Sequence, residues 1–166
     1  VAEDAFFGNF HLYATAWADL DVDGDLDMVG ASYDSELNQQ GRGTGGVFLY
    51  TNDEGRLTPL RLSPDASALA LVLTDLNGDG RRDILVGNDF HPADAVFFNT
   101  PKGWIDAAPF THTTTNTMSF AEGDIDNDGI PELLATDMKP YRQDEATAHA
   151  WAPMMAGEAS LHADDV

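Results

Sequence analysis

The feature that most constrains this chain is an acidic segment that occurs three times with the same nine-residue pattern. The copies begin at Asp19, Asp75 and Asp124, which are 56 and 49 residues apart, and they align without gaps. Each copy has a carboxylate or amide side chain at positions 1, 3, 5 and 9 and a glycine at position 6. We name residues 19–27, 75–83 and 124–132 the first, second and third acidic loops. Such a repeat predicts a fold built from similar units.

A second marker indicates the length of the unit. Val47–Tyr50 and Val96–Asn99 share an apolar pattern, begin 49 residues apart, and each begin 28 residues before the next acidic loop. The first loop begins 28 residues before Val47, but the second begins 21 residues before Val96. The unit is therefore about 49 residues long, with a seven-residue insertion in the first copy. The insertion falls within residues 34–46, whose Gly, Asn and Gln content is typical of a surface loop.

Short apolar runs around each acidic loop predict β-strands. One strand is expected before each loop (11–17, 69–73, 118–121) and one after it (26–29, 84–86, 133–135). The second marker predicts a third strand, and turns at 52–55 and 100–103 lead into a fourth. Four strands in about 49 residues match one blade of a β-propeller.

The sequence therefore predicts an all-β chain that forms a partial β-propeller of about two and a half four-stranded blades. The incomplete propeller is expected over residues 1–139, with blades at about 10–62, 63–109 and 110–139. An ordinary β-sandwich whose acidic turns look alike is the alternative fold.

Residues 140–166 break the repeat. The stretch Arg142–Ala152 favours a helix, with Pro140 ahead of it and Pro153 after it. It stands where the third and fourth strands of the third unit are expected. We therefore expect a C-terminal helical segment over 140–166, as an insertion or a tail.

The spacing of the acidic loops matches the requirements of Ca²⁺. Alternate positions turn side-chain oxygens toward one point, while the glycine takes the sharp corner. Position 7 contributes its backbone carbonyl, so its side chain is free to vary. Oxygen ligands without nitrogen or sulfur favour Ca²⁺ over Mg²⁺ and transition metals. The sequence predicts three calcium sites, with these ligands: Asp19, Asp21, Asp23, Asp25 and Asp27; Asp75, Asn77, Asp79, Arg81 and Asp83; Asp124, Asp126, Asp128, Ile130 and Glu132, where Asp25, Arg81 and Ile130 act through their carbonyls.

The acidic loops allow two other interpretations. An EF-hand shares the first half of the pattern, but it needs a glutamate at position 12 and helices on both sides. Position 12 holds Gly30, Val86 and Ala135, and the flanks are strand-like. The other interpretation is solvated acidic turns without metal. Three copies of one ligand pattern argue against it, because unpaired carboxylates so close together would repel strongly.

These loops resemble the calcium-binding segments of FG-GAP/VCBS repeats, the blades of integrin α-subunit propellers and of many secreted bacterial proteins. Phe48–Gly55 resembles the hairpin that follows in such blades. Thr117–Phe120, Asp124–Gly129 and Thr136–Pro140 look closest to the cartilage acidic protein and ASPIC/UnbV-associated branch. The resemblance covers about residues 10 to 139 and implies metal-ligand roles for positions 1, 3, 5 and 9 of each loop. The third loop departs from it with Glu132 at position 9.

Charge excludes two classes of partner. The chain has 29 Asp+Glu against 8 Lys+Arg, a formal net charge of -21 and a pI of about 4.1. Nucleic acids and anionic membrane surfaces are themselves negative, so neither is expected as a partner. Cysteine is absent, and no apolar run is long enough to predict a membrane span. Because the chain begins at Val1 without a leader, we expect a removed signal or an excerpt of a longer polypeptide.

Enzymatic chemistry has little support in the sequence, which lacks a nucleophile elbow, a phosphate-binding Gly-Lys loop and a His-Glu-x-x-His pair. We expect a secreted, extracellular or periplasmic calcium-binding propeller segment that serves in protein interaction, adhesion or assembly, with structural calcium. Its expected partners are other protein subunits or the remainder of a longer chain. Trp151, Met154 and Met155 are a candidate docking patch, or alternatively pack against the propeller. The alternative is the propeller part of a polysaccharide-active secreted enzyme, with extracellular carbohydrate as partner.

Overall fold

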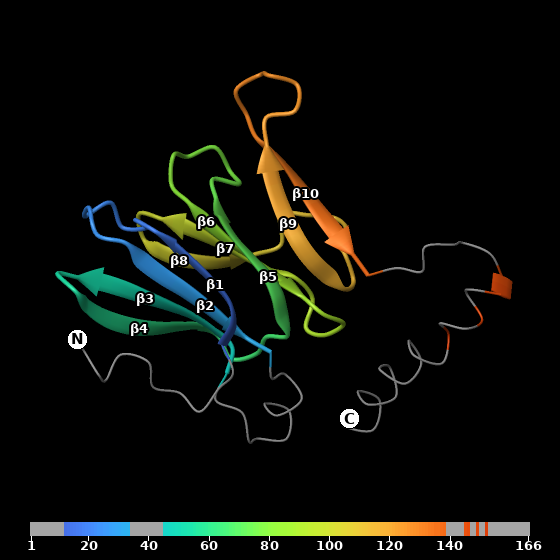
Figure 1. Cartoon of the computed structure of the whole chain (residues 1–166). Coiled ribbons are helices and arrows are strands. Elements are labelled where there is room, and N and C mark those ends of the chain that lie inside the picture. Colours follow the sequence, from blue (N-terminus) through green and yellow to red (C-terminus); the bar gives the residue numbers. More distant parts are fainter. Residues whose placement is uncertain (1–11, 34–44, 139–144, 147–148, 150–151, 153–166) are drawn as a thin grey trace.

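The computed structural model describes residues 12–33, 45–138, 145–146, 149 and 152. In this part of the chain ten strands form three antiparallel sheets, with the orders β1-β2-β3-β4, β5-β6-β7-β8 and β10-β9 (Figure 1). The strands are β1 (Leu12–Ala18), β2 (Asp27–Ser32), β3 (Val47–Asp53), β4 (Arg56–Ser63), β5 (Ala68–Thr74), β6 (Asp83–Asn88), β7 (Ala95–Thr100), β8 (Gly103–Ala107), β9 (Thr117–Gly123) and β10 (Glu132–Asp137). Each strand within a sheet pairs with the next strand along the chain. The all-β fold expected from the sequence is confirmed.

Both expected hairpin turns form. In the β3–β4 hairpin Asp53 pairs with Arg56, and the two residues between them, Glu54 and Gly55, have φ angles of 51° and 86°. Positive φ at both central residues gives a turn whose twist matches that of the flanking strands. In the β7–β8 hairpin Thr100 pairs with Gly103.

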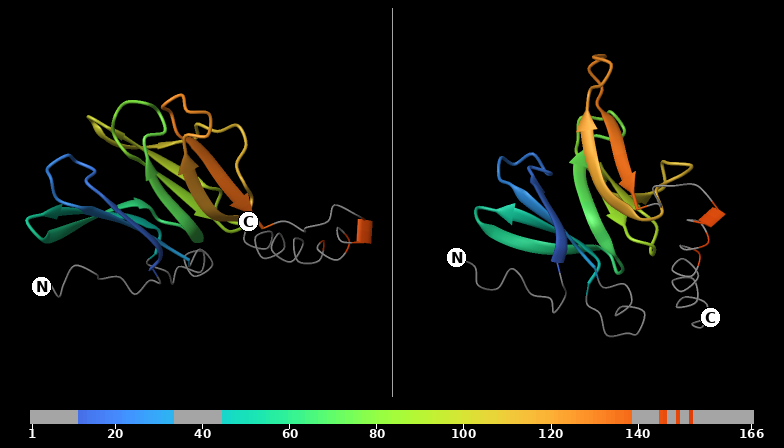
Figure 2. Two further views of the ribbon diagram at one scale, coloured as in Figure 1. Left: turned by 45° about the horizontal axis from the view of Figure 1, so that its top comes forward. Right: turned by 45° about the vertical axis from the view of Figure 1, so that its right-hand side comes forward.

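The three sheets are arranged radially. Their first strands, β1, β5 and β9, lie side by side, and β1 and β9 each contact β5. The other strands of each sheet fan outward from this inner row (Figure 2). Blades of a propeller are arranged in this way around their central channel. The fold is therefore consistent with a partial propeller.

The main core lies between the first sheet (β1–β4) and the second (β5–β8). It is made of small and branched side chains, which let the two sheets approach closely, and β2 and β6 are buried along their whole length. The core residues are Ala14, Ala18, Leu20, Val29, Ala31, Val47, Leu49, Ala66, Ala68, Leu73, Ile84, Val86 and Phe97. Burial of this apolar surface is the main favourable term that holds the two sheets together.

The second and third sheets are in close contact at one glycine. A Cβ atom added at Gly87 on β6 would lie 2.4 Å from Cγ2 of Thr117 and 2.9 Å from the ring of Phe120, both on β9. A larger residue here would force the Thr117 and Phe120 side chains to shift, so the glycine allows β6 and β9 to approach this closely. The third sheet (β9–β10) is otherwise thinly covered, and Leu134 on β10 is 60% exposed.

The β register corrects the length of the insertion expected from the sequence. Tyr50 on β3 pairs with Met28, 22 residues earlier, whereas Phe97 on β7 pairs with Ile84, 13 residues earlier. Met28 and Ile84 both directly follow position 9 of their loops, so Tyr50 corresponds to Phe97, 47 residues later. The first unit therefore carries an insertion of nine residues, and aligning Val47 with Val96 was wrong by two residues.

Two further expectations concern parts of the chain that are largely not described. The insertion at 34–46 lies outside the described residues except for Gly45 and Gly46. The helical segment over 140–166 is not supported: only Glu145, Ala146, His149 and Ala152 of it are described, too few to define a helix. The candidate docking patch at Trp151, Met154 and Met155 lies outside the described residues. Within the described residues, no helix is long and apolar enough to cross a membrane.

Candidate metal centres

The three acidic loops are equivalent turns at the same end of the three sheets. They join β1 to β2, β5 to β6 and β9 to β10, the first and second strands of each sheet (Figures 1 and 2). Each loop begins directly after the last residue of an inner strand, and its ninth residue is the first residue of the second strand. The antiparallel pairing of the two strands therefore brings positions 1 and 9 together.

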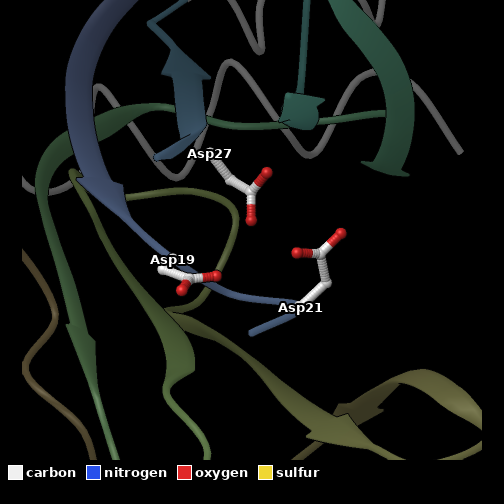
Figure 3. A group of neighbouring side chains, drawn as sticks. All are labelled: Asp19, Asp21 and Asp27. Atoms are coloured by element: carbon white, nitrogen blue, oxygen red, sulfur yellow. The ribbon is translucent and has the colours of Figure 1, made fainter. Parts of the chain in front are cut away.

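In the first loop three carboxylates converge on one space. Asp19, Asp21 and Asp27 each offer an oxygen atom, and these atoms lie within 4.8 Å of one another (Figure 3). Asp19 is held by the loop itself, since Oδ1 accepts a hydrogen bond from the Asp23 N–H and Oδ2 from the Gly24 N–H, both at 3.1 Å. Gly24 has a φ of 100°, a conformation that favours glycine, and this explains the invariant glycine at position 6.

Asp27, at position 9, is fully buried and fixed from two directions. Its Oδ2 accepts a hydrogen bond from the Leu20 N–H and its Oδ1 from the Asn52 N–H on β3, both at 2.8 Å. Among the five predicted ligands, Asp23 and Asp25 lie outside the converging group. The side chain of Asp23 accepts the Asp25 N–H at 2.9 Å, and that of Asp25 accepts the Glu54 N–H at 3.0 Å.

Electrostatics in the first loop favour a cation. Partial desolvation, followed by the negative charges of Asp27, Asp23 and Asp19, raises the pKa of Asp21 above its usual value. The carboxylates therefore repel one another when no cation is present, and a bound cation would relieve that repulsion.

The second loop repeats the backbone hydrogen bonds of the first loop, but it also contains a positively charged side chain, Arg81. Asp75 accepts hydrogen bonds from the N–H groups of Gly78 and Gly80 at 2.8 and 2.7 Å. The guanidinium of Arg81 lies 3.0 Å from Asp79 Oδ2. Hydrogen bonding from the Arg81 N–H and the charge of Arg81 lower the pKa of Asp79. As a ligand Arg81 is expected to act only through its carbonyl, and its side chain would compete with a metal for Asp79.

Position 9 of the second loop is buried as in the first. Asp83 accepts the Leu76 N–H at 3.0 Å and the Asn99 N–H, from β7, at 2.8 Å. Desolvation raises the pKa of Asp83 despite these hydrogen bonds. Asn77, at position 3, accepts the Asp79 N–H at 2.9 Å.

The carboxylates that converge in the third loop are exposed to solvent. Asp124, Asp126 and Glu132 offer oxygen atoms within 4.8 Å of one another. Asp124 accepts the Gly129 N–H at 2.9 Å, and Glu132 accepts the Ile125 N–H at 2.7 Å. The longer Glu132 side chain therefore reaches the same backbone donor as the aspartates at position 9 of the other loops. Asp128 accepts the Ile130 N–H at 2.8 Å and lies outside the converging group.

The donor set fits a hard divalent cation. Positions 1, 3 and 9 present carboxylate or amide oxygens in all three loops, and the predicted ligands include no nitrogen or sulfur donor. The roles of the carbonyls of Asp25, Arg81 and Ile130 stay a prediction. The sequence did not predict the backbone N–H groups of Asn52 and Asn99, which donate hydrogen bonds to the position 9 carboxylates from the third strand. Nothing in the spacing of a loop indicates a hydrogen-bond partner on another strand.

These observations define a class of protein: antiparallel sheets repeated along the chain, each with an acidic loop between its first two strands. The family model described as FG-GAP-like repeat matches residues 19–86 and 75–135, which together span more than half of the chain. The chain belongs to the FG-GAP-like repeat family.

The curated relatives include integrin α chains. Human integrin alpha-7 is 46% identical over 94 residues, covering 51% of this chain and 8% of the relative. Integrin alpha-4 of Xenopus laevis is 28% identical over 146 residues, covering 76% of this chain and 14% of the relative. The chain therefore spans only a small part of the length of these relatives. The expected likeness to integrin α propellers is confirmed, and the finer likeness to the cartilage acidic protein branch stays a prediction.

Proposed function

We propose that this chain is part of a calcium-binding β-propeller that serves as a protein-interaction scaffold outside the cytoplasm. Each acidic loop would hold one Ca²⁺ ion. The observation that carries this proposal is the convergence of carboxylates at positions 1, 3 and 9 in the first and third loops, within a pattern that occurs a third time in the second loop.

The proposed role of calcium is structural. When bound, the ion supplies the positive charge that offsets the repulsion among the loop carboxylates. Asp19 and Asp27 lie at the two ends of the first loop and already accept backbone N–H groups, so both are oriented before any ion binds. Joining these two ends would brace the turn between β1 and β2.

Exposure at both ends of the sheet row supports a larger propeller. Trp17 and Leu73 both lie two residues before their acidic loops, yet Trp17 is 51% exposed and Leu73, which faces the first sheet, is 7% exposed. At the other end, Val29, Leu85 and Leu134 each lie two residues after position 9, and only Leu134 is exposed. Repeats bury such surfaces by stacking. We therefore propose a neighbouring blade beyond each end, from a longer chain or another subunit.

The proposed location and partner class rest on two further arguments. Sites of this kind in extracellular modules bind calcium with dissociation constants of about 10⁻⁴–10⁻³ M, which suits extracellular calcium levels. The relatives with the family's repeats are integrin α chains, which favours adhesion or protein interaction as the role of the surface.

A role in a polysaccharide-active enzyme finds less support. A cavity of about 300 Å³ lies between the second and third sheets and is lined by Leu85, Phe110, Phe120, Leu133 and Asp94, among others. Glycoside hydrolysis generally requires a pair of carboxylates. Within the described residues Asp94 is the one carboxylate that lines this cavity, and it is engaged by the hydroxyl of Thr117 at 2.8 Å and of Thr114 at 3.1 Å.

Calorimetry and thermal unfolding test the calcium proposal. Calcium should bind with three sites per chain and raise the melting temperature, since binding to the native state adds stability at each site. Asp19→Ala and Asp124→Ala should each remove one site, and magnesium should have a much smaller effect. An unchanged melting temperature in calcium and in chelator would contradict the proposal.

A further inference from the structure

Asn52 and Asn99 occupy equivalent positions but use their side chains differently. Each lies on the third strand of its sheet and donates its backbone N–H to the position 9 carboxylate, Asp27 or Asp83, at 2.8 Å. The Asn52 side chain stays within the first sheet, where Nδ2 donates to the Leu26 carbonyl at 3.2 Å. The Asn99 side chain leaves its own sheet: Nδ2 donates to the carbonyl of Leu20, in the first loop, at 2.7 Å.

The second loop fixes the backbone of Asn99 on both sides. The Asn99 N–H is bound to Asp83, and its carbonyl accepts a hydrogen bond from Arg81 Nε at 2.9 Å. Asp83 and Arg81 are positions 9 and 7 of the second loop. The position of the Asn99 side chain therefore follows the conformation of that loop.

Leu20 receives this bond at the centre of the first loop. It lies between Asp19 and Asp21, and its N–H donates to Asp27, so all three converging carboxylates depend on its peptide groups. Leu20 and Asn99 are both buried, so the bond between them is largely shielded from water. One continuous path of hydrogen bonds thus runs from Asp83 through Asn99 and Leu20 to Asp27.

We propose that Asn99 is a positioning residue that couples calcium binding in the first and second loops. Calcium in the second loop would hold Asp83, and with it Asn99, more rigidly, so that the Asn99 amide restrains the Leu20 peptide in the conformation that gathers the first-loop carboxylates. The first loop loses less conformational entropy when its own ion binds, so binding is positively cooperative. Coupling is reciprocal, so calcium in the first loop strengthens the second by the same factor. The inference rests on the proposed function, since both loops must bind calcium.

A double-mutant cycle tests the coupling. The third loop is disabled in every variant by Asp124→Ala, and the calcium affinity of the first loop is measured by calorimetry with the second loop intact or disabled by Asp75→Ala. Disabling the second loop should weaken the first about two- to tenfold, the range that one net hydrogen bond produces. In the Asn99→Ala background this difference should vanish. The matched control Asn52→Ala, which leaves the bridge in place, should retain it.

Amide hydrogen exchange gives a second readout that keeps Asn99 in place. In a protein whose first and third loops are disabled by Asp21→Ala and Asp124→Ala, calcium binding to the second loop should slow exchange at Leu20 and leave Ile125, the corresponding residue of the third loop, unchanged. Independent binding by the two loops, coupling that survives Asn99→Ala, or unchanged exchange at Leu20 would overturn the inference. Failure of every loop to bind calcium would instead overturn the proposed function, and the inference with it.

Discussion

The first and third acidic loops have the same internal construction in very different surroundings. In both, position 1 accepts the N–H of the position 6 glycine, and position 9 accepts the N–H of position 2. Yet the position 2 side chain is 4% exposed in the first loop (Leu20) and 75% exposed in the third (Ile125). The nine-residue pattern therefore encodes the shape of the loop, and the surrounding strands determine how firmly it is held.

The difference in burial arises because the first loop is covered by β3 of its own sheet and by the neighbouring second sheet. Asp27 has a second backbone donor, Asn52 on β3, and Leu20 is covered by the second sheet. Within the described residues Glu132 accepts one hydrogen bond, from the Ile125 N–H, and the described part of the third sheet ends with β10. The hydrogen bonds within each loop come from residues of the loop itself, whereas the additional contacts of the first loop come from residues later in the chain.

The largest expected difference in the free energy of unfolding is between substitutions of the two position 9 residues, Asp27 and Glu132. Asp27→Ala leaves one buried donor, the Leu20 N–H, and one half-buried donor, the Asn52 N–H, without an acceptor, and should lower the free energy of unfolding by about 2–4 kcal/mol. Glu132→Ala frees one donor that water can reach and should lower it by less than about 1 kcal/mol. Urea unfolding in chelator measures both without a contribution from metal. Similar losses would contradict the difference in burial.

The second-largest expected difference in unfolding free energy is between substitutions of the position 2 residues, Leu20 and Ile125. Leu20→Ala removes a core side chain and should cost about 2–4 kcal/mol of unfolding free energy. Ile125→Ala should change it by less than about 0.5 kcal/mol, because Ile125 is mostly exposed. Thermal unfolding of the two variants checks this; a large loss at Ile125 would mean that something covers the third loop.

The second loop extends the comparison to charge. Asn77 replaces a carboxylate and Arg81 pairs with Asp79, so this loop should bind calcium most weakly of the three. Arg81→Gln should strengthen it by up to about fivefold, the range for a partly exposed ion pair. Arg82→Gln is the matched control, since Arg82 donates to the Leu73 carbonyl. Calorimetry distinguishes them, and loss of the tightest site in Asp79→Ala would refute the ranking.

The smallest effect concerns position 4, where the backbone is left-handed in all three loops. Val22, Gly78 and Asn127 have φ angles of 65°, 74° and 61°. A β-branched side chain fits this conformation poorly, whereas asparagine tolerates it. Val22→Asn should therefore raise the free energy of unfolding by about 0.5–1 kcal/mol, and Asn127→Val should lower it by a similar amount. Two neutral swaps would show that Val22 is not strained.

The sequence predicted the strands and turns well because their signals are local. Alternating apolar residues and the Glu54-Gly55 turn each lie within a few positions. The alignment of the third strands failed by two residues for a physical reason: side chains alternate with a period of two along a strand. A shift of two therefore keeps the same side chains on the same face, and only the pairing of Tyr50 with Met28 and Phe97 with Ile84 identifies the true register.

For the candidate sites, too, the sequence predicted the residues within each loop but not the contacts made by residues outside it. The residues at positions 1, 3 and 9 follow from the spacing, and two of the three loops bring them together as acidic groups. The contributions of Asn52 and Asn99 come from 25 and 16 residues beyond the carboxylates that they bind. The ion pair of Arg81 depends on a side-chain conformation that the pattern leaves open.

The hydrogen bond between Asn99 and Leu20 joins residues that are 79 positions apart. Synthesis on the ribosome proceeds from the N-terminus, and domains generally fold as units while the chain emerges. The first sheet can form from its own hairpins as soon as β4 is available, but its acidic loop receives its last contact only after β7 has emerged. The second sheet therefore completes the site of the first, so the first acidic loop matures one sheet behind the growing chain.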